Sequence, residues 1–160
     1  MEIVRSESKV NPTMSRLEPE TRDRYPYFLT LTTRWMDNDV YRHVNNVVYY
    51  SFFDTAVNQY MLSQGVLDFD KSSTVSLVVD TGCTFFSPVS FPDVIHCGLR
   101  VVDLGSSSVR YEIGVFRNEE PHTAARGHFV HVCCERERLT PVAMPAELRA
   151  ALERLKLPAA

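Results

Sequence analysis

The sequence lacks three features that would mark a specialised class of protein. It has no apolar run approaching the ~18 residues of a membrane-spanning helix. Its net charge is −3, without the positive excess that nucleic acids attract. Its N-terminus has no continuous apolar core of the kind that secretory signals carry. We therefore expect a cytoplasmic protein that binds neither membranes nor nucleic acids.

Cysteines are few, and their spacing does not suit zinc. The four thiols are Cys83, Cys97, Cys133 and Cys134, with no paired C-x-x-C spacing among them. Cys133 and Cys134 are adjacent, so in a strand they would point to opposite faces. We expect four reduced and mostly buried thiols and no metal site.

What is present is the composition of an ordinary globular domain. The 160 residues are 44% hydrophobic and 23% charged, which is enough for one domain with a substantial core. Residues 1–24 mix Glu, Arg, Ser and Pro without apolar periodicity, and they predict a flexible N-terminal tail. The remaining residues, 25–160, are expected to form a single domain.

Alternating apolar residues predict five strands. The expected strands cover residues 27–35, 74–86, 94–104, 108–117 and 123–135. The last four are joined by short turns, which favour antiparallel pairing. In the second strand the alternation predicts that one face carries Val75, Leu77, Val79, Thr81, Cys83 and Phe85.

Between the first two strands the apolar period changes to that of a helix. Residues 46–63 carry apolar side chains at helical spacing, and further apolar residues fill much of the remaining circumference. Such a helix is expected to be buried on most sides and to be covered by the sheet. Residues 145–155 predict a shorter amphipathic helix, with Pro145 in its first turn.

Potentially reactive side chains are concentrated where the first strand ends and the long helix begins. Asp37, Asp39 and His43 lie within seven residues of one another, and Asn45 and Asn46 follow at once. A helix N-terminus offers free N–H groups and a partial positive charge. A carboxylate beside such donors is suited to chemistry on a carbonyl group, although the same residues also suit a well-capped helix.

This segment resembles a known family signature. The run is Arg34-Trp35-x-Asp37-x-Asp39-x-x-x-His43-Val44-Asn45-Asn46-x-x-Tyr49. It is similar to the signature of hotdog-fold acyl-CoA thioesterases of the 4-hydroxybenzoyl-CoA thioesterase-like branch. The resemblance implies an α+β hotdog fold, in which a five-stranded antiparallel sheet wraps around one long central helix. It also implies a homodimer or homotetramer, and no cofactor beyond the CoA of the substrate.

The resemblance assigns the main catalytic roles to two residues. Asp39 matches the family position that attacks the thioester carbonyl or activates a water that does so. The backbone N–H of Asn46 matches the helix-terminal donor that polarises this carbonyl, a role that the helix dipole independently favours. Asp37 is expected to organise the turn through hydrogen bonds.

Two further residues are weaker catalytic candidates. His43 either holds the loop through hydrogen bonds or positions water or substrate. Asp54 lies mid-helix, near the turn where a sister thioesterase branch carries its catalytic Glu, and it is otherwise a hydrogen-bonded structural residue. A Ser-His-Asp triad is not expected, because the chain has no G-x-S-x-G nucleophile elbow.

Substrate-binding candidates come from three places. Arg42 stands where the family often has Gly, and it either contacts a CoA phosphate or points to solvent. Tyr49 lines an acyl or aryl pocket or belongs to the core. Ser107, Ser108 and Arg110 follow a turn resembling one that approaches CoA in this family, although an ordinary hairpin explains them equally.

Two other functions remain open at this stage. The hotdog fold also supports dehydratases and hydratases, and a non-hydrolytic acyl-CoA binding module is a further alternative. The His43-Val44-Asn45-Asn46 run fits a dehydratase poorly. The retained Asp37 and Asp39 favour an acyl-CoA or aryl-CoA thioester hydrolase.

Overall fold

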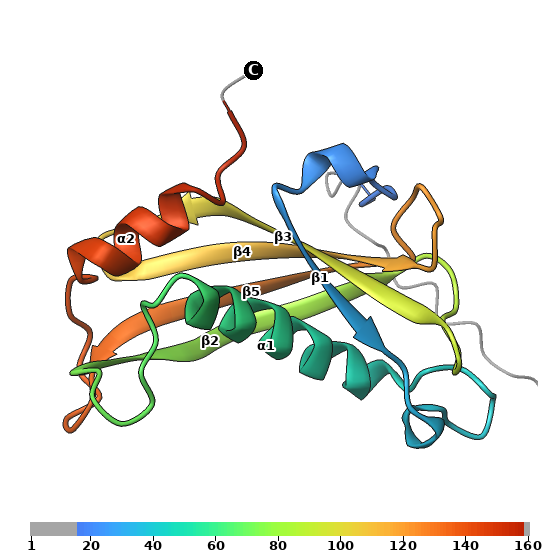
Figure 1. Cartoon of the computed structure of the whole chain (residues 1–160), viewed down its shortest axis with the longest axis horizontal. Coiled ribbons are helices and arrows are strands. Elements are labelled where there is room, and N and C mark those ends of the chain that lie inside the picture. Colours follow the sequence, from blue (N-terminus) through green and yellow to red (C-terminus); the bar gives the residue numbers. More distant parts are fainter. Residues whose placement is uncertain (1–15, 159–160) are drawn as a thin grey trace, which may run out of the picture.

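The computed structural model describes residues 16–158 and shows one antiparallel sheet with a long helix lying against it (Figure 1). The strands are β1 (Tyr27–Thr32), β2 (Thr74–Phe85), β3 (Val94–Leu104), β4 (Ser108–Arg117) and β5 (Ala125–Glu135). The helices are α1 (Asn46–Ser63), α2 (Ala146–Glu153) and two short 3-10 helices, η1 (Arg22–Arg24) and η2 (Trp35–Asp37). The five strands are ordered β1-β3-β4-β5-β2. The predicted hotdog fold is confirmed.

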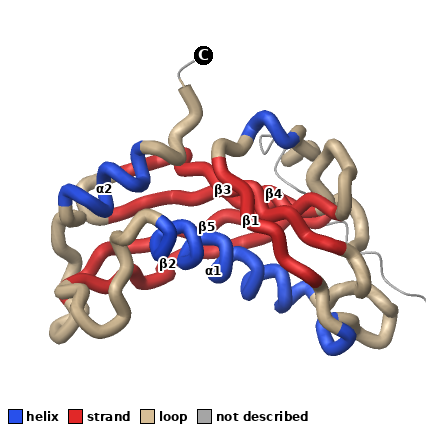
Figure 2. The backbone as a smooth tube through the Cα atoms, viewed as in Figure 1, coloured by secondary structure: helices blue, strands red, loops and turns tan. Residues whose placement is uncertain are grey.

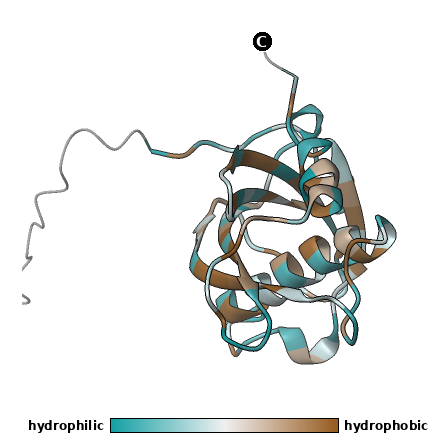
Figure 3. Cartoon of the chain, turned by 90° about the vertical axis from the view of Figure 1, so that its left-hand side faces the viewer, coloured by the Kyte–Doolittle hydropathy of each residue, from teal (hydrophilic) through white to brown (hydrophobic). Residues whose placement is uncertain are grey.

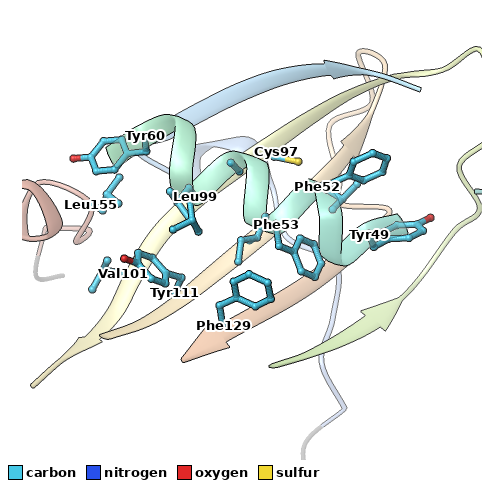
Figure 4. Close-up of a cluster of buried hydrophobic side chains, with 14 of the residues drawn as sticks. Tyr49, Phe52, Phe53, Tyr60, Cys97, Leu99, Val101, Tyr111, Phe129 and Leu155 are labelled. Carbon is cyan, nitrogen blue, oxygen red and sulfur yellow. The ribbon is translucent and has the colours of Figure 1, made fainter. Parts of the chain in front are cut away.

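The core lies between α1 and the face of the sheet that curves toward it (Figures 2 and 4). Phe53 of α1 is fully buried and meets Phe129 of β5 edge to face, with 5.8 Å between ring centroids. At the far end of the helix, the Tyr60 hydroxyl donates a 2.6 Å hydrogen bond to the Ala151 carbonyl of α2. Hydrophobic residues dominate the strands that surround the helix (Figure 3). The helix α1 therefore covers most of the inner face of the sheet.

The first predicted strand ends earlier than its alternation indicates. The sequence places Leu29, Leu31, Thr33 and Trp35 on one face, but β1 ends at Thr32 and Trp35 begins η2. Trp35 is 83% exposed, so its predicted place on the strand is wrong. The chain turns there because a buried Asp37 carboxylate closes the turn back onto the Arg34 backbone.

A bulge overturns the predicted face of β2. The register against β5 shifts between Val78 and Asp80, so that Val78 lies opposite His131 and Thr81 lies opposite Phe129. Directly opposed residues share a face. The extra residue, Val79, therefore moves Thr81, Cys83 and Phe85 to the α1 side, away from the face of Val75 and Leu77.

The helix is buried on its sheet side only. Its inward residues are almost completely buried, whereas Val47 is 64% and Leu62 is 41% exposed. Within residues 16–158 nothing covers this outer side, so the prediction of burial on most sides is wrong for a single protomer. Apolar residues remain there for another surface to cover.

The outer face of the sheet is covered by the segment that precedes β1. The sequence predicts a flexible tail over residues 1–24, of which residues 1–15 lie outside the described part. The Glu20 backbone N–H donates to the Thr123 hydroxyl at 3.0 Å, and its carboxylate accepts from Arg100 at 3.1 Å. Tyr25 is 4% exposed. The end of the expected tail is thus a packed strap.

All four cysteines are free, and three of them are buried, as predicted. None of the described helices is long and apolar enough to cross a membrane.

Candidate active site

The loop between β1 and α1, residues 33–45, is held in shape by a buried carboxylate. Asp37 is 2% exposed and accepts hydrogen bonds from the Arg34 backbone N–H at 2.7 Å and from its guanidinium at 2.8 and 3.1 Å. Its backbone carbonyl accepts from the Asn45 N–H at 2.9 Å. Asp37 therefore organises the turn, as predicted, and it does not face solvent.

The connection between β2 and β3, residues 86–93, clamps this loop from the side. The Val44 N–H donates to the Val89 carbonyl at 2.7 Å, and the Phe91 N–H donates to the Asn38 side chain at 3.0 Å. The sequence indicated only turns in this connection. Its structural role depends on contacts between residues that are far apart along the chain.

Asp39 is oriented by the loop and retains an unused oxygen. The residue is half-buried, and its Oδ1 accepts a 2.8 Å hydrogen bond from the Tyr41 N–H. Its own N–H donates to the His43 carbonyl at 2.8 Å. Within residues 16–158 no hydrogen bond reaches Oδ2. That oxygen is available to a substrate or a water molecule.

Asn46 begins α1 with a free backbone donor. Asn45 caps the helix: its side chain accepts from the Val47 N–H at 3.2 Å, and its carbonyl accepts from the Val48 N–H at 2.9 Å. The Asn46 N–H has no acceptor among the described residues. It lies at the positive end of the helix dipole, where it can donate to developing negative charge.

Asp39 and Asn46 line the same cleft, which has a volume of about 470 Å³. Two other predicted residues, His43 and Tyr49, line it as well. Its remaining wall comes from Val44, Phe85, Phe86, Ser87 and Pro88. The sequence did not indicate the last four as site residues, because only the fold brings the end of β2 beside the start of α1.

Tyr49 and His43 differ in how the structure uses them. Tyr49 is 3% exposed and packs on Phe85 with ring centroids 4.9 Å apart, and burial raises the pKa of its phenol to about 12. It therefore serves as an uncharged wall. His43 is exposed, and its side chain makes no hydrogen bond with a described residue. Only its carbonyl holds the loop, so its imidazole is open to the cleft.

Arg42 has an unusual backbone for its residue type. Its φ is +64°, in the left-handed region that glycine adopts most easily. Its carbonyl accepts a 2.8 Å hydrogen bond from the Ser90 hydroxyl, and its side chain is exposed. It borders a second hollow of about 530 Å³ with Asp39, Trp35, Asn38 and Phe91. Asp39 thus lies between two hollows, one of them beside a cationic side chain.

Asp54 lies apart from this cleft in a single protomer. It is eight residues beyond Asn46 on α1, a separation of about 12 Å along the helix axis. Its side chain is exposed and makes no hydrogen bond with a described residue, although partial burial raises its pKa. A hydrogen-bonded structural role for this carboxylate therefore finds no partner among the described residues of one protomer. Asp54 lines a different cavity, between α1 and β2.

The fold does not bring the remaining predicted residues to Asp39 within one protomer. Ser107 and Ser108 lie at the β3–β4 turn, at the end of the sheet away from the 33–45 loop (Figure 1). Arg110 lies opposite Val130 and pairs with Asp80 at 3.8 Å. Its strand neighbours Val109 and Tyr111 are the residues buried toward α1, so Arg110 faces the other side of the sheet.

Among residues 16–158, no group of three His, Cys, Asp or Glu side chains is placed to hold a metal ion. The reactive groups that line the cleft are the Asp39 carboxylate, the His43 imidazole and the backbone of Asn46. These groups suit attack on a carbonyl carbon with stabilisation of its oxygen.

Comparisons with known proteins agree with this geometry. A family model described as the thioesterase-like superfamily matches residues 33–152. The PA5185 protein from Pseudomonas aeruginosa has 48% sequence identity and a TM-score of 0.86, with 89% of this chain and 100% of that chain covered. No curated protein matches.

Two more distant structures share the architecture. The PA2801 protein from Pseudomonas aeruginosa is 26% identical with a TM-score of 0.74, covering 79% of this chain and 98% of that chain. Slr0204, a 1,4-dihydroxy-2-naphthoyl-CoA thioesterase from Synechocystis, is 16% identical with a TM-score of 0.74, covering 82% and 98%. The second likeness shows the fold alone. Since the family model spans the loop, α1 and all the later strands, the chain belongs to the thioesterase-like superfamily and is a thioester hydrolase.

Proposed function

We propose that the protein hydrolyses an acyl-CoA or aryl-CoA thioester to the free acid and CoA, with Asp39 as the nucleophile or general base. One observation carries this proposal: Asp39 and Asn46 line the same cleft, and neither the Asp39 Oδ2 atom nor the Asn46 N–H has a partner among the described residues. The name of the Synechocystis structure, a naphthoyl-CoA thioesterase, supports a CoA thioester as the substrate class.

Two routes lead from this arrangement to the products. In the first, Asp39 attacks the carbonyl carbon, the CoA thiolate leaves, and water hydrolyses the resulting mixed anhydride. In the second, Asp39 takes a proton from water, whose oxygen attacks the carbonyl carbon while the thiolate leaves. Both routes place negative charge on the carbonyl oxygen. A donor such as the Asn46 N–H stabilises that charge by roughly 3 kcal/mol, and His43 is placed to orient the water.

The substrate is proposed to enter along two surfaces. Arg42 borders the hollow beside Asp39 and offers a positive charge to a CoA phosphate. Tyr49 supplies an aromatic wall for the acyl or aryl group.

A homodimer formed through β2 would complete the site. β2 is a 12-residue edge strand, and its apolar residues Val78 and Val79 are 46% and 59% exposed. A long apolar edge of this kind is an aggregation hazard unless another strand covers it. We propose that two β2 strands pair antiparallel across a two-fold axis. A tetramer would be a pair of such dimers.

The two-fold axis has a consequence for the active site. The Asp39 cleft touches Phe85 at the end of β2, whereas the Asp54 cavity touches Thr74, Val75, Ser76 and Val78 at its beginning. Antiparallel pairing of two β2 strands sets the beginning of one against the end of the other. The Asp54 cavity of the partner would then adjoin this protomer's Asp39. The same symmetry brings the partner's β3–β4 turn, with Ser107 and Ser108, into that half of the assembly.

The test is an assay of hydrolysis on a panel of acyl-, aryl- and hydroxybenzoyl-CoA thioesters, in which the release of free thiol is measured. Asp39→Asn retains an oxygen that accepts from the Tyr41 N–H, so the loop should keep its shape. We expect it to lower kcat by about a hundredfold to ten-thousandfold with an unchanged melting temperature. Asp54→Asn tests the second candidate carboxylate in the same assay.

The outcomes separate the candidate functions. An Asp39→Asn variant as fast as the wild type would overturn the role of Asp39, and loss confined to Asp54→Asn would transfer it to Asp54. Tight binding of CoA thioesters without any thiol release would indicate a binding module. A dehydratase would change the absorbance of a 3-hydroxyacyl-CoA while releasing no thiol.

The free thiols of the four cysteines support the proposed cytoplasmic location, since that compartment keeps cysteines reduced.

A further inference from the structure

The loop of residues 33–45 reverses its direction at Arg42, whose backbone is strained. Its φ of +64° lies in the left-handed region, which the Cβ atom of an arginine disfavours. The Arg42 N–H donates to the Asp39 carbonyl at 3.0 Å, and the Asp39 N–H donates to the His43 carbonyl at 2.8 Å. These two bonds close the turn around Arg42. The position of Asp39 therefore depends on Arg42 keeping a conformation that its residue type does not favour.

The hydroxyl group of Ser90 acts directly on this strained residue. It donates a 2.8 Å hydrogen bond to the Arg42 carbonyl, across 48 positions of the chain. Its neighbours Val89 and Phe91 also bond the loop, but they do so through backbone atoms. A substitution of Ser90 can thus remove the bond to Arg42 while leaving the two flanking contacts in place.

Ser90 is itself fixed to the ends of three strands. Its N–H donates to the Asp93 carboxylate at 2.9 Å, and its carbonyl accepts from the Asp93 N–H at 2.7 Å. The other oxygen of this carboxylate accepts from the side chain of Asn118, which follows β4, at 2.8 Å. The Asp93 carbonyl accepts from the hydroxyl of Thr33, which follows β1, at 2.6 Å. Because Asp93 directly precedes β3, Ser90 is held by the sheet and can serve as a rigid support.

From these contacts we infer that Ser90 is a positioning residue for the proposed hydrolysis. Its hydroxyl holds the Arg42 peptide in the left-handed conformation and thereby keeps the Asp39 carboxylate placed at the cleft. The inference rests on the proposed function, since the placement of Asp39 affects the rate only if Asp39 reacts. A glycine at position 42 adopts this conformation easily, so the arginine is what makes the support of Ser90 necessary.

The first experiment measures kcat and KM for a hydrolysed CoA thioester. Ser90→Ala should lower kcat by roughly fivefold to tenfold with little change in KM, because Ser90 lines neither hollow beside Asp39. Ser90→Thr keeps the hydroxyl and should restore most of the rate. Ser63→Ala is the matched control: it removes a 2.7 Å bond from a serine hydroxyl to a backbone carbonyl at the opposite end of α1. Its kcat should equal that of the wild type.

A double-mutant cycle tests whether Ser90 acts through Arg42. In an Arg42→Gly background the conformation needs less support, so adding Ser90→Ala should lower kcat by less than about twofold. An equal fall in both backgrounds would overturn the inference. So would a Ser90→Ala variant with wild-type kcat. Neither result would affect the role of Asp39, which the Asp39→Asn variant tests separately.

A further readout does not depend on catalysis. Hydrogen exchange of the Asp39 and Arg42 backbone amides, followed by NMR, should be faster in Ser90→Ala than in the wild type. It should return to the wild-type rate in Ser90→Thr and stay at that rate in Ser63→Ala. Unchanged exchange in Ser90→Ala would show that Ser90 does not hold the loop. If no thioester is hydrolysed, the proposed function fails, and a faster exchange would then leave Ser90 as a support of the loop without a catalytic purpose.

Discussion

At the scale of single residues, hydrogen-bond partners separate two carboxylates that look equivalent in the sequence. Asp37 is enclosed by the Arg34 side chain and backbone, whereas Asp39 has one oxygen bound by a backbone N–H and one without a partner within residues 16–158. A saturated carboxylate holds a turn, and an unsaturated one can react. The two carboxylates differ because Asp37, at the end of η2, is buried, whereas Asp39, two residues later, lines the cleft.

A substitution of Arg42 tests how much the backbone conformation of one residue costs in stability. Holding a non-glycine residue in the left-handed region costs roughly 1–2 kcal/mol of stability. Replacing it with glycine removes this cost, but part of the gain is lost because glycine makes the unfolded chain more flexible. We expect Arg42→Gly to increase the free energy of unfolding by up to about 1 kcal/mol, measured by urea denaturation.

Arg42→Lys separates backbone strain from charge. It retains both the Cβ atom and the positive charge, so its stability should match that of the wild type. If Arg42 contacts a CoA phosphate, the KM for CoA thioesters should rise in Arg42→Gly and change much less in Arg42→Lys. Equal KM values in all three proteins would show that the side chain only faces solvent.

At the scale of elements, the strap before β1 is fixed by one aromatic ring over two glycines. A Cβ atom added to Gly98 or Gly114 would lie 2.6 Å from the Tyr25 ring, far inside contact distance. The Arg100 guanidinium also lies over this ring, 4.9 Å from its centroid. No local pattern indicated this packing, since Tyr25, Gly98 and Gly114 meet only through the fold.

Gly114→Ala tests this packing. The added methyl group meets the buried Tyr25 ring, so we expect a loss of about 1–3 kcal/mol in unfolding free energy, measured by chemical denaturation. Gly82→Ala is the matched control, because its Cβ meets only the half-exposed His128 side chain, which can rotate away. Similar losses in the two variants would contradict a specific role for the Tyr25 contact.

At the scale of the whole molecule, the exposed side of α1 and the free edge of β2 point to the same missing partner. The loop residues Val40 and Tyr41, beside Asp39, are 90% and 78% exposed. A monomer that leaves so many apolar side chains in water is unfavourable. A two-fold dimer through β2 would cover the edge and join two incomplete clefts.

Val79→Lys tests the dimer. Val79 is the bulge residue of the edge strand, so a charge there should prevent edge pairing and convert the protein to a monomer in sedimentation experiments. Thioesterase activity should fall with it. Val102→Lys is the control, because Val102 is also exposed and lies at the bulge of β3, an interior strand. A Val79→Lys protein that remains dimeric would place the interface elsewhere.

The elements and their order could be predicted from local patterns in the sequence. Apolar residues recurring every two positions predicted β2 to β5, and those recurring every 3.6 positions predicted α1. The predicted bounds lie within two residues of the observed ones, because these periods reflect which side chains each element buries. The D-x-D motif before α1 located the reactive segment, because a strand end followed by a helix N-terminus is a local arrangement.

Which residues meet could not be predicted in this way and follows from the folded chain. It placed Phe85 and Pro88 in the cleft that Asp39 lines, moved Trp35 into solvent, and reversed the face of β2 at Val79. Each of these depends on contacts between segments that are distant along the chain. A local pattern cannot encode them, because the same pattern fits either face of a strand until its neighbour is in place.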